Sequence, residues 1–422
     1  MGPISRVAVL ALALMSMTAC ASVRPAHRTA VDYNRAFADS RNEILLLNVL
    51  RAAGREPLQF STMGTATGSA SGTSELSLPL NNLIGGGTNP FTVSPSLTMT
   101  ETNPSLTIIP LSDREFTAGI LRPISPEHLS YFLNQGWDAE FVLQLAVGGV
   151  RCPGGVVVLN RGNYKEDAYH SFLRMFSAAE ENGTTIEQRT ADAGKPTPLT
   201  MPSHEALPFL QNGVGAGRRV TDVTAEGSNA VVHIQAFRSY WVATDIDFTA
   251  VCGSPPPGVT PQRDASGNPF TLLGDVPSDH PLRAVASSNG SLQLRSVESM
   301  IYFLGETQRI WIDRELQRCA GRQVDDGRHP PFPTYGDYPP GTPHEARRAL
   351  FRTRVTCNEG AVPLHAAVRT SFNGRYYYIP QLNGAADRDR TLKTLSFLSE
   401  LIALQTSQSL IESSSPTIAI SR

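Results

Sequence analysis

The chain has 422 residues and a formal net charge of −2, with 41% hydrophobic and 18% charged residues. This length suggests two or three globular domains, and the composition excludes a disordered or fibrous protein. The nearly neutral charge balance gives no electrostatic reason to expect a nucleic-acid partner.

The first twenty residues have the pattern of a secretory signal. Arg6 precedes an apolar run from Val7 to Met15, and Met-Thr-Ala follows shortly before Cys20. A bilayer-spanning helix needs about 20 apolar residues, so this shorter run is predicted to be a signal peptide over residues 1–19 and not an anchor helix.

The cysteine directly after Thr-Ala resembles the lipobox of bacterial lipoproteins. The resemblance implies that the Cys20 sulfur carries a diacylglyceryl group, that the chain is cut before it, and that the new amino terminus is acylated with a fatty acid such as palmitate. In that family the next residue directs sorting, and Ala21 favours the outer membrane, with the body facing the periplasm. An ordinary signal peptide with a chance cysteine is the alternative.

The rest of the chain is predicted to be α+β, with two mixed domains of helices and antiparallel sheet and an extended β arm rich in Ser, Thr and Gly. The predicted segments are a lipidated tether (20–30), an N-terminal helical segment (31–60), the β arm (61–110), an α+β domain (111–252), a Pro/Gly-rich linker (253–284) and a C-terminal α+β domain (285–422). Apolar residues at helical spacing predict a helix from Val31 to Ala53. The stretch from Asn42 to Pro57 loosely resembles uncharacterised proteobacterial lipoproteins, a resemblance that implies no activity.

The β arm is almost free of charge and alternates apolar with other residues at period two, for example at Leu76, Leu78 and Leu80. Such alternation predicts strands with one apolar face. Either the arm is a long surface hairpin, or it inserts into the outer membrane as in oligomeric lipoprotein pores. Membrane strands carry aromatic girdles, whereas Phe91 is the arm's one aromatic residue.

Local signals define several elements of the two predicted domains. Ser125-Pro126-Glu127 predicts the start of a helix that Gly136 ends. The apolar run from Trp137 to Val150 is predicted to be strand. In the C-terminal domain, a helix is expected from Val297 to Arg318. Asn373-Gly374 predicts a tight hairpin turn between strands at 364–372 and 375–380.

Four cysteines remain after Cys20, and an oxidising compartment favours disulfides between them. Three pairings of Cys152, Cys252, Cys319 and Cys357 are possible, and the sequence does not choose among them. Cys152–Cys252 and Cys319–Cys357 are favoured, because each bridge then stays within one predicted domain. Four reduced, buried thiols are the alternative.

Aromatic residues indicate a possible binding surface beside the predicted hairpin turn. Tyr376 and Tyr378 share one face of a strand, with Arg375 nearby, while Tyr377 points to the other face. Tyrosine is enriched at interfaces, so one face is a candidate surface for a glycan or a protein. Core packing with the hydroxyls at the rim is the competing interpretation.

Catalytic signals are weak. The chain has no Gly-x-Ser-x-Gly elbow, no P-loop and no His-x-x-x-His spacing, so neither a metal nor a cofactor is expected. Asp279-His280 and His204-Glu205 place an acid beside a base in predicted loops, where solvated side chains are the commoner interpretation.

Three function hypotheses follow. The first is a non-enzymatic outer-membrane scaffold or assembly factor, anchored through its lipid, with envelope proteins or further copies of itself as partners. The second is an oligomeric pore or secretion component that inserts the 61–110 hairpin into the membrane. The third is a membrane-tethered hydrolase of envelope polymers that uses the loop acid–base pairs.

Overall fold

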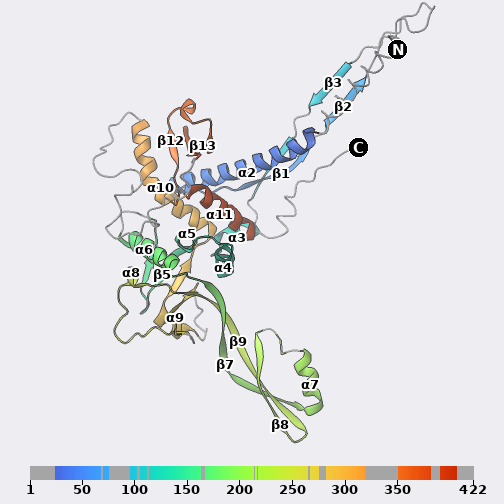
Figure 1. Cartoon of the computed structure of the whole chain (residues 1–422), viewed down its shortest axis with the longest axis vertical. Coiled ribbons are helices and arrows are strands. Elements are labelled where there is room, and N and C mark those ends of the chain that lie inside the picture. The colour runs from blue at the N-terminus through green and yellow to red at the C-terminus, as the bar shows by residue number, and fades with distance from the viewer. Residues whose placement is uncertain are drawn as a thin grey trace, which may run out of the picture. The chain divides into compact units, whose positions relative to one another are not determined.

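The structure is a computed structural model that describes residues 24–67, 70–75, 96–101, 105–111, 114–162, 167–212, 214–215, 217–264, 267–274, 282–319, 350–381 and 390–405. It has two compact units. Figure 1 labels the helices and strands. The larger unit contains the described residues up to 58 and from 117 to 405, and the smaller unit contains residues 59–116. The predicted combination of helices and sheets with an extended β arm is confirmed.

The described helices are α2 (Arg24–Ala53), α3 (Arg114–Leu121), α4 (Pro126–Asn134), α5 (Ala139–Ala146), α6 (Asp167–Glu181), α7 (Ser203–Asn212), α8 (Thr249–Cys252), α9 (Arg283–Asn289), α10 (Val297–Cys319), α11 (Thr391–Gln405) and the 3₁₀ turn η2 (Glu359–Ala361). The described strands are β1 (Ser61–Thr67), β2 (Ala70–Glu75), β3 (Ser96–Glu101), β4 (Ser105–Pro110), β5 (Val147–Arg151), β6 (Val157–Leu159), β7 (Ile186–Pro202), β8 (Arg218–Glu226), β9 (Asn229–Thr244), β10 (Phe270–Leu273), β11 (Ser291–Leu294), β12 (Arg354–Thr356), β13 (Ala366–Phe372) and β14 (Arg375–Pro380).

Helix α2 begins at Arg24, inside the stretch that the sequence predicted to be a flexible tether up to residue 30. Pro25 lies in the first turn, where the missing N–H costs no intrahelical hydrogen bond, so it does not prevent the helix from starting there. The C-terminal half of α2 buries Leu46 and Val49 completely. The helix ends where Gly54 donates its N–H to the carbonyl of Leu50.

Helices α2 and α10 pack closely because α10 carries a glycine at the contact. A methyl group built on Gly305 would lie 2.6 Å from the backbone nitrogen of Ala53 and 2.7 Å from the Cβ of Ala52. These distances are shorter than any van der Waals contact, so one methyl group at residue 305 would force the two helices apart.

We expect Gly305→Ala to lower the free energy of unfolding by about 1–3 kcal/mol through this overpacking. Alanine is intrinsically better than glycine in a helix by about 1 kcal/mol, so a loss of stability would isolate the steric effect. Urea unfolding would measure it. Gly360→Ala is the control, because the nearest atom to a methyl group there is 3.7 Å away. A Gly305→Ala variant as stable as the parent would contradict the prediction.

The central sheet of the larger unit has the strand order β6-β5-β11-β10-β9-β7, and β8 also pairs with β9. Only β10 and β11 are parallel among these pairs, and the others are antiparallel. Strand β11 lies between β5 and β10, so the sheet combines strands from the segments that the sequence assigned to a first domain, a linker and a second domain.

Helix α5 corrects the strand predicted from Trp137 to Val150: residues 139–146 are helical, and the strand β5 starts only at Val147. Every residue of α5 is buried. A helix that is buried on all sides gives the same continuous apolar run as a buried strand, so periodicity could not separate the two. Helix α4, by contrast, starts as predicted, with the Ser125 hydroxyl accepting the N–H of Glu127.

A separate three-stranded antiparallel sheet has the order β12-β14-β13. Its hairpin turn is the predicted one: Asn373 has φ 48° and Gly374 has φ 72°. Two consecutive positive φ angles are what a type I′ turn requires, which explains the Asn-Gly pair.

The smaller unit contains the predicted β arm as paired strands. Strand β1 pairs with β4, and β2 pairs with β3. Ser61 lies opposite Pro110 and Glu75 lies opposite Ser96, and within the β1–β4 ladder the register shifts by one position between Met63 and Ala66. The Leu76–Leu80 alternation falls outside the described part of the arm.

Candidate functional site

The outward face of the three-stranded sheet gathers two arginines, two tyrosines and two hydroxyl residues. Tyr378 on β14 lies directly between Arg354 on β12 and Arg369 on β13. Tyr376 lies in the same way between Thr356 and Ser371. Residues paired across a sheet point to the same side, so these six share one face, which we call the tyrosine face.

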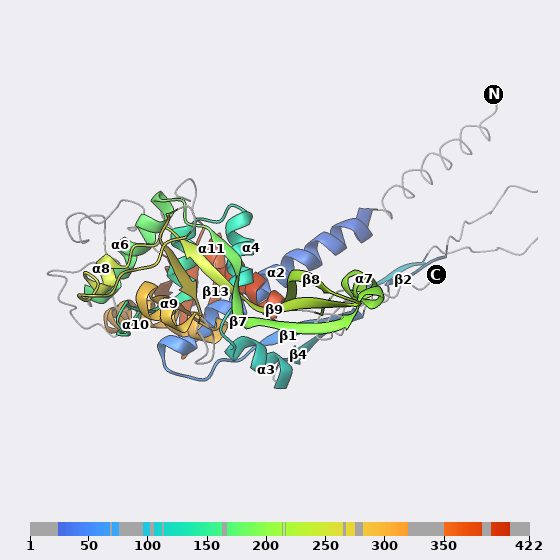
Figure 2. The ribbon, with the colours of Figure 1, turned by 90° about the horizontal axis from the view of Figure 1, so that it is seen from below.

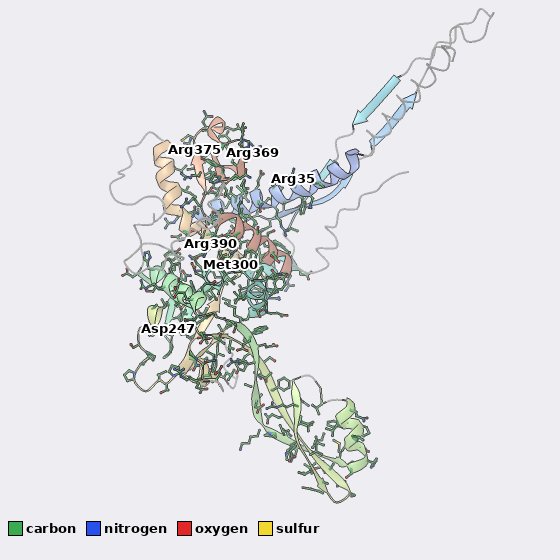
Figure 3. The ribbon with its side chains drawn as sticks, viewed as in Figure 1. Arg35, Asp247, Met300, Arg369, Arg375 and Arg390 are labelled. Atoms are coloured by element: carbon green, nitrogen blue, oxygen red, sulfur yellow. A yellow bond between two sulfur atoms is a disulfide. The ribbon has the colours of Figure 1, made fainter. Side chains whose placement is uncertain are left out.

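The opposite face of this sheet points into the core. Tyr377 and Ile379 are buried, as is Val368 on β13. Arg375 lies opposite Phe372 and has the same parity along β14 as Tyr377, so it does not belong to the tyrosine face. Figure 3 labels Arg369 and Arg375, which both belong to this sheet. The predicted alternation of the three tyrosines is confirmed, and the binding role of Tyr376, Tyr378 and Arg375 stays a prediction.

The sequence analysis missed Arg354 and Arg369. Arg369 could have been found, because a two-residue Asn373-Gly374 loop places Phe372 opposite Arg375 and therefore Arg369 opposite Tyr378. No local signal places Arg354, since β12 joins β14 from a separate part of the chain.

A second exposed feature is an arm formed by the outer parts of β7 and β9 together with β8 and α7 (Figure 2). Strand β9 pairs with β7 along almost its whole length, and residues 229–236 also pair with β8. A bulge in β7 between Ala193 and Thr197 separates its inner from its outer part. The buried amide of Gln235 donates to the carbonyls of Ala193 and Gly194 at 3.4 and 3.0 Å, which holds the bulge in place.

The outer part of this arm exposes aliphatic side chains. Leu199 on β7 and Val223 on β8 both lie opposite Val232 on β9, so the three form one row on one face. Val232 is fully buried, whereas Leu199 and Val223 are 40% and 43% exposed. Leu207 on α7 is also exposed. Exposed apolar side chains on one face of an element, such as Leu199 and Val223, make that face a candidate contact surface for a protein.

Cys152 and Cys252 form a disulfide, which confirms one of the two predicted bridges. Cys357 is also disulfide-bonded. The side chain of Cys319, its predicted partner, is not among those described. Disulfides persist in oxidising compartments, so the observed bridge agrees with export from the cytoplasm.

A charged pair joins α5 to the start of α11 inside the larger unit. The Arg390 guanidinium donates to both carboxylate oxygens of Glu140, each at 3.1 Å. The two side chains are only 4% and 2% exposed. The carboxylate therefore accepts both bonds from a structural partner and is closed to solvent, which makes it a packing element and not a catalytic group.

Arg295 is a second buried cation, and it holds the end of α5. It donates to the carbonyls of Gln144 and Asn160 and to that of Leu145 at 2.8 Å, and it lies 3.8 Å from the centre of the Phe303 ring. Burial lowers its pKa to about 9, and burial raises the pKa of the nearby Tyr169 to about 12. Both groups keep their neutral-pH protonation, and a cation at a helix C-terminus is stabilised by the helix dipole.

The predicted loop acid–base pairs form no site in the described residues. His204 and Glu205 lie 3.7 Å apart at the start of α7, where their side chains are 81% and 62% exposed. Asp279 and His280 belong to a segment that the structure does not describe. Within the described ranges, no group of three or more His, Cys, Asp or Glu side chains could hold a metal ion.

Cys20 and the predicted signal peptide precede the first described residue, so lipidation stays a prediction. In the portion of the chain that the structure covers, none of the helices combines the length and apolar character needed to cross a bilayer. Comparisons with protein-family models, with curated proteins and with solved structures show no match.

Proposed function

We propose that this chain is a non-enzymatic lipoprotein of the bacterial outer membrane that acts as a scaffold or assembly factor in an envelope complex. Its anchor is Cys20, and its partners are envelope proteins or further copies of itself. The arm of β7, β8, β9 and α7 is the observation that carries this proposal, because a partner could bind the exposed Leu199 and Val223 without disturbing the main core. The Cys152–Cys252 disulfide supports the envelope location.

The arm is suited to contact a partner at a distance from the body. A strand rises by about 3.3 Å per residue. The outer residues of β9, 229–234, therefore extend the sheet by roughly 20 Å. The bulge, anchored by Gln235, gives this extension a defined start. A partner that covers Leu199 and Val223 would bury the apolar surface that they still expose.

A photo-crosslinking amino acid at each strand position would test this function in intact cells. We expect crosslinks to an envelope protein, or to a second copy, from residues 199 and 223. Thr200 and Thr224 lie opposite Val231 and so point to the other face, which makes them matched controls. Equal crosslinking from all four positions, or none from 199 and 223, would contradict a partner-binding arm.

The anchor is tested separately by Cys20→Ser. We expect the parent chain to sediment with membranes and to take up radiolabelled palmitate, and the variant to do neither. Incorporation of label that is unaffected by the substitution would argue against lipidation at this residue.

An oligomeric pore is a second candidate, and the hairpin of the smaller unit favours it. Strands β1 to β4 have six or seven residues each, whereas a membrane strand requires about 9–11, so insertion would need the β1–β4 and β2–β3 ladders together. Two strands cannot close a barrel, so several copies would each have to supply a hairpin. This candidate predicts ring-shaped particles in electron micrographs, and loss of the rings when residues 70–101 are removed.

A further inference from the structure

The tyrosine face carries two positive charges and no acidic residue among its six positions (Arg354, Thr356, Arg369, Ser371, Tyr376 and Tyr378). Arg354 and Arg369 are exposed. Glu43 on α2 is an acidic group that is electrostatically coupled to Arg369. Two arginines in one row of a sheet repel each other. An anionic ligand that bridges them would be attracted by both charges and would offset their repulsion.

We propose that the tyrosine face binds an acidic saccharide, with uronate carboxylates held by Arg354 and Arg369 and a sugar ring lying on Tyr378. This inference rests on the register of the sheet and does not depend on lipidation or on the scaffold function.

The spacing of the side chains fits an extended ligand. The two arginines are separated by two strand spacings, which corresponds to about 10 Å between their backbones. Tyr376 and Tyr378 are two residues apart on β14, about 7 Å along the strand. A ligand lying across the strands would therefore meet a guanidinium, a phenol ring and a second guanidinium in turn.

The residue types match the chemistry of such a ligand. The planar guanidinium of arginine can donate two parallel hydrogen bonds to one carboxylate. Each tyrosine offers a flat apolar ring with a polar tip. Thr356 and Ser371 add hydroxyl groups that can both donate and accept, which suits a polyhydroxylated ligand.

Tyrosine and arginine are also enriched at protein interfaces, so an acidic peptide is the competing occupant, and the binding test includes one. None of the six residues is buried, so they form an open face and not a desolvated pocket. An open face suits a saccharide, whose hydroxyl groups can stay partly hydrated when it binds.

Calorimetric titration of the full chain would test the inference, with trigalacturonate as the acidic probe and maltotriose as its neutral counterpart. Triglutamate and glucose 6-phosphate test whether a peptide carboxylate or a phosphate serves equally well. We expect trigalacturonate to bind about tenfold or more tightly than the other three probes, with an affinity that falls as salt is added.

Substitutions on the two faces of β14 and its neighbours locate the site. Arg354→Gln and Arg369→Gln should each weaken trigalacturonate binding by about fivefold or more, through loss of a charge-assisted contact. Arg369→Lys keeps the charge but not the bidentate geometry, and should also weaken it. Arg375→Gln changes an arginine of β14 that lies on the face opposite to Tyr378, and it should change the affinity by less than about twofold. Unfolding midpoints would confirm that each variant is folded.

Three results would overturn the proposal: no saturable binding of trigalacturonate, equal or tighter binding of triglutamate or glucose 6-phosphate, or a loss in Arg375→Gln as large as that in Arg369→Gln.

Discussion

Replacing Glu140 with leucine is expected to lower the free energy of unfolding by about 3–5 kcal/mol. The substitution leaves the Arg390 guanidinium buried without its carboxylate. An unpaired buried charge has lost its hydration and has no ion pair or hydrogen bond to compensate for that loss. Leucine has a volume close to that of glutamate, so the effect would not come from a cavity. Chemical unfolding of the purified chain measures it.

The double variant Glu140→Leu/Arg390→Met separates two contributions to the free energy of unfolding: the destabilisation by an unpaired buried charge and the net stabilisation by the intact ion pair. Removing both charges should restore stability to within about 1 kcal/mol of the parent or better, because a buried ion pair roughly offsets its own desolvation. If the double variant were as unstable as the single one, the pair itself would be the main source of stability.

Lys393 and Asp138 supply a matched control, because they join the same two segments, α11 and the residue before α5. Their nitrogen and oxygen atoms are 2.7 Å apart, but both side chains are 36% exposed. Lys393→Gln should therefore cost about 1 kcal/mol or less. If Glu140→Leu lowered the free energy of unfolding by no more than Lys393→Gln does, burial of the ion pair would not be the reason for the large effect.

The second large effect is expected from the disulfide. Replacing Cys152 and Cys252 together by alanine should lower the free energy of unfolding by about 2–5 kcal/mol. The bridge joins residues that are 100 positions apart. In the chain-entropy account, closing a loop of that length restricts the unfolded chain by about 4.7 kcal/mol.

The double cysteine variant also avoids leaving one free thiol that could form a wrong bridge. Adding reductant should change the stability of this variant only through the disulfide at Cys357. The free energy of unfolding of the parent should fall toward that of the variant under the same conditions. A variant within about 1 kcal/mol of the parent under oxidising conditions would show that the loop is constrained by packing alone.

For the candidate site, the sequence indicated the right strand but not the full set of residues. Tyr376 and Tyr378 were identified from their spacing, and the Asn373-Gly374 turn contains the information that places Arg369 beside Tyr378. Arg354 depends on β12 docking against β14, and no neighbouring residue signals that contact. Arg375 was grouped with the tyrosines because it is adjacent in sequence, although adjacent residues on a strand point to opposite sides.

The sequence by itself determined the features that arise within a few residues of one another: the Ser125 cap of α4 and the Asn373-Gly374 hairpin. Their free energy comes from local backbone geometry, so the local residues specify them.

Only the tertiary structure decided that residues 139–146 form a helix, that β11 separates β5 from β10, and that Glu140 meets Arg390 across 250 positions. These outcomes depend on which surfaces bury one another. The free energy of that burial is set by residues far apart in the sequence.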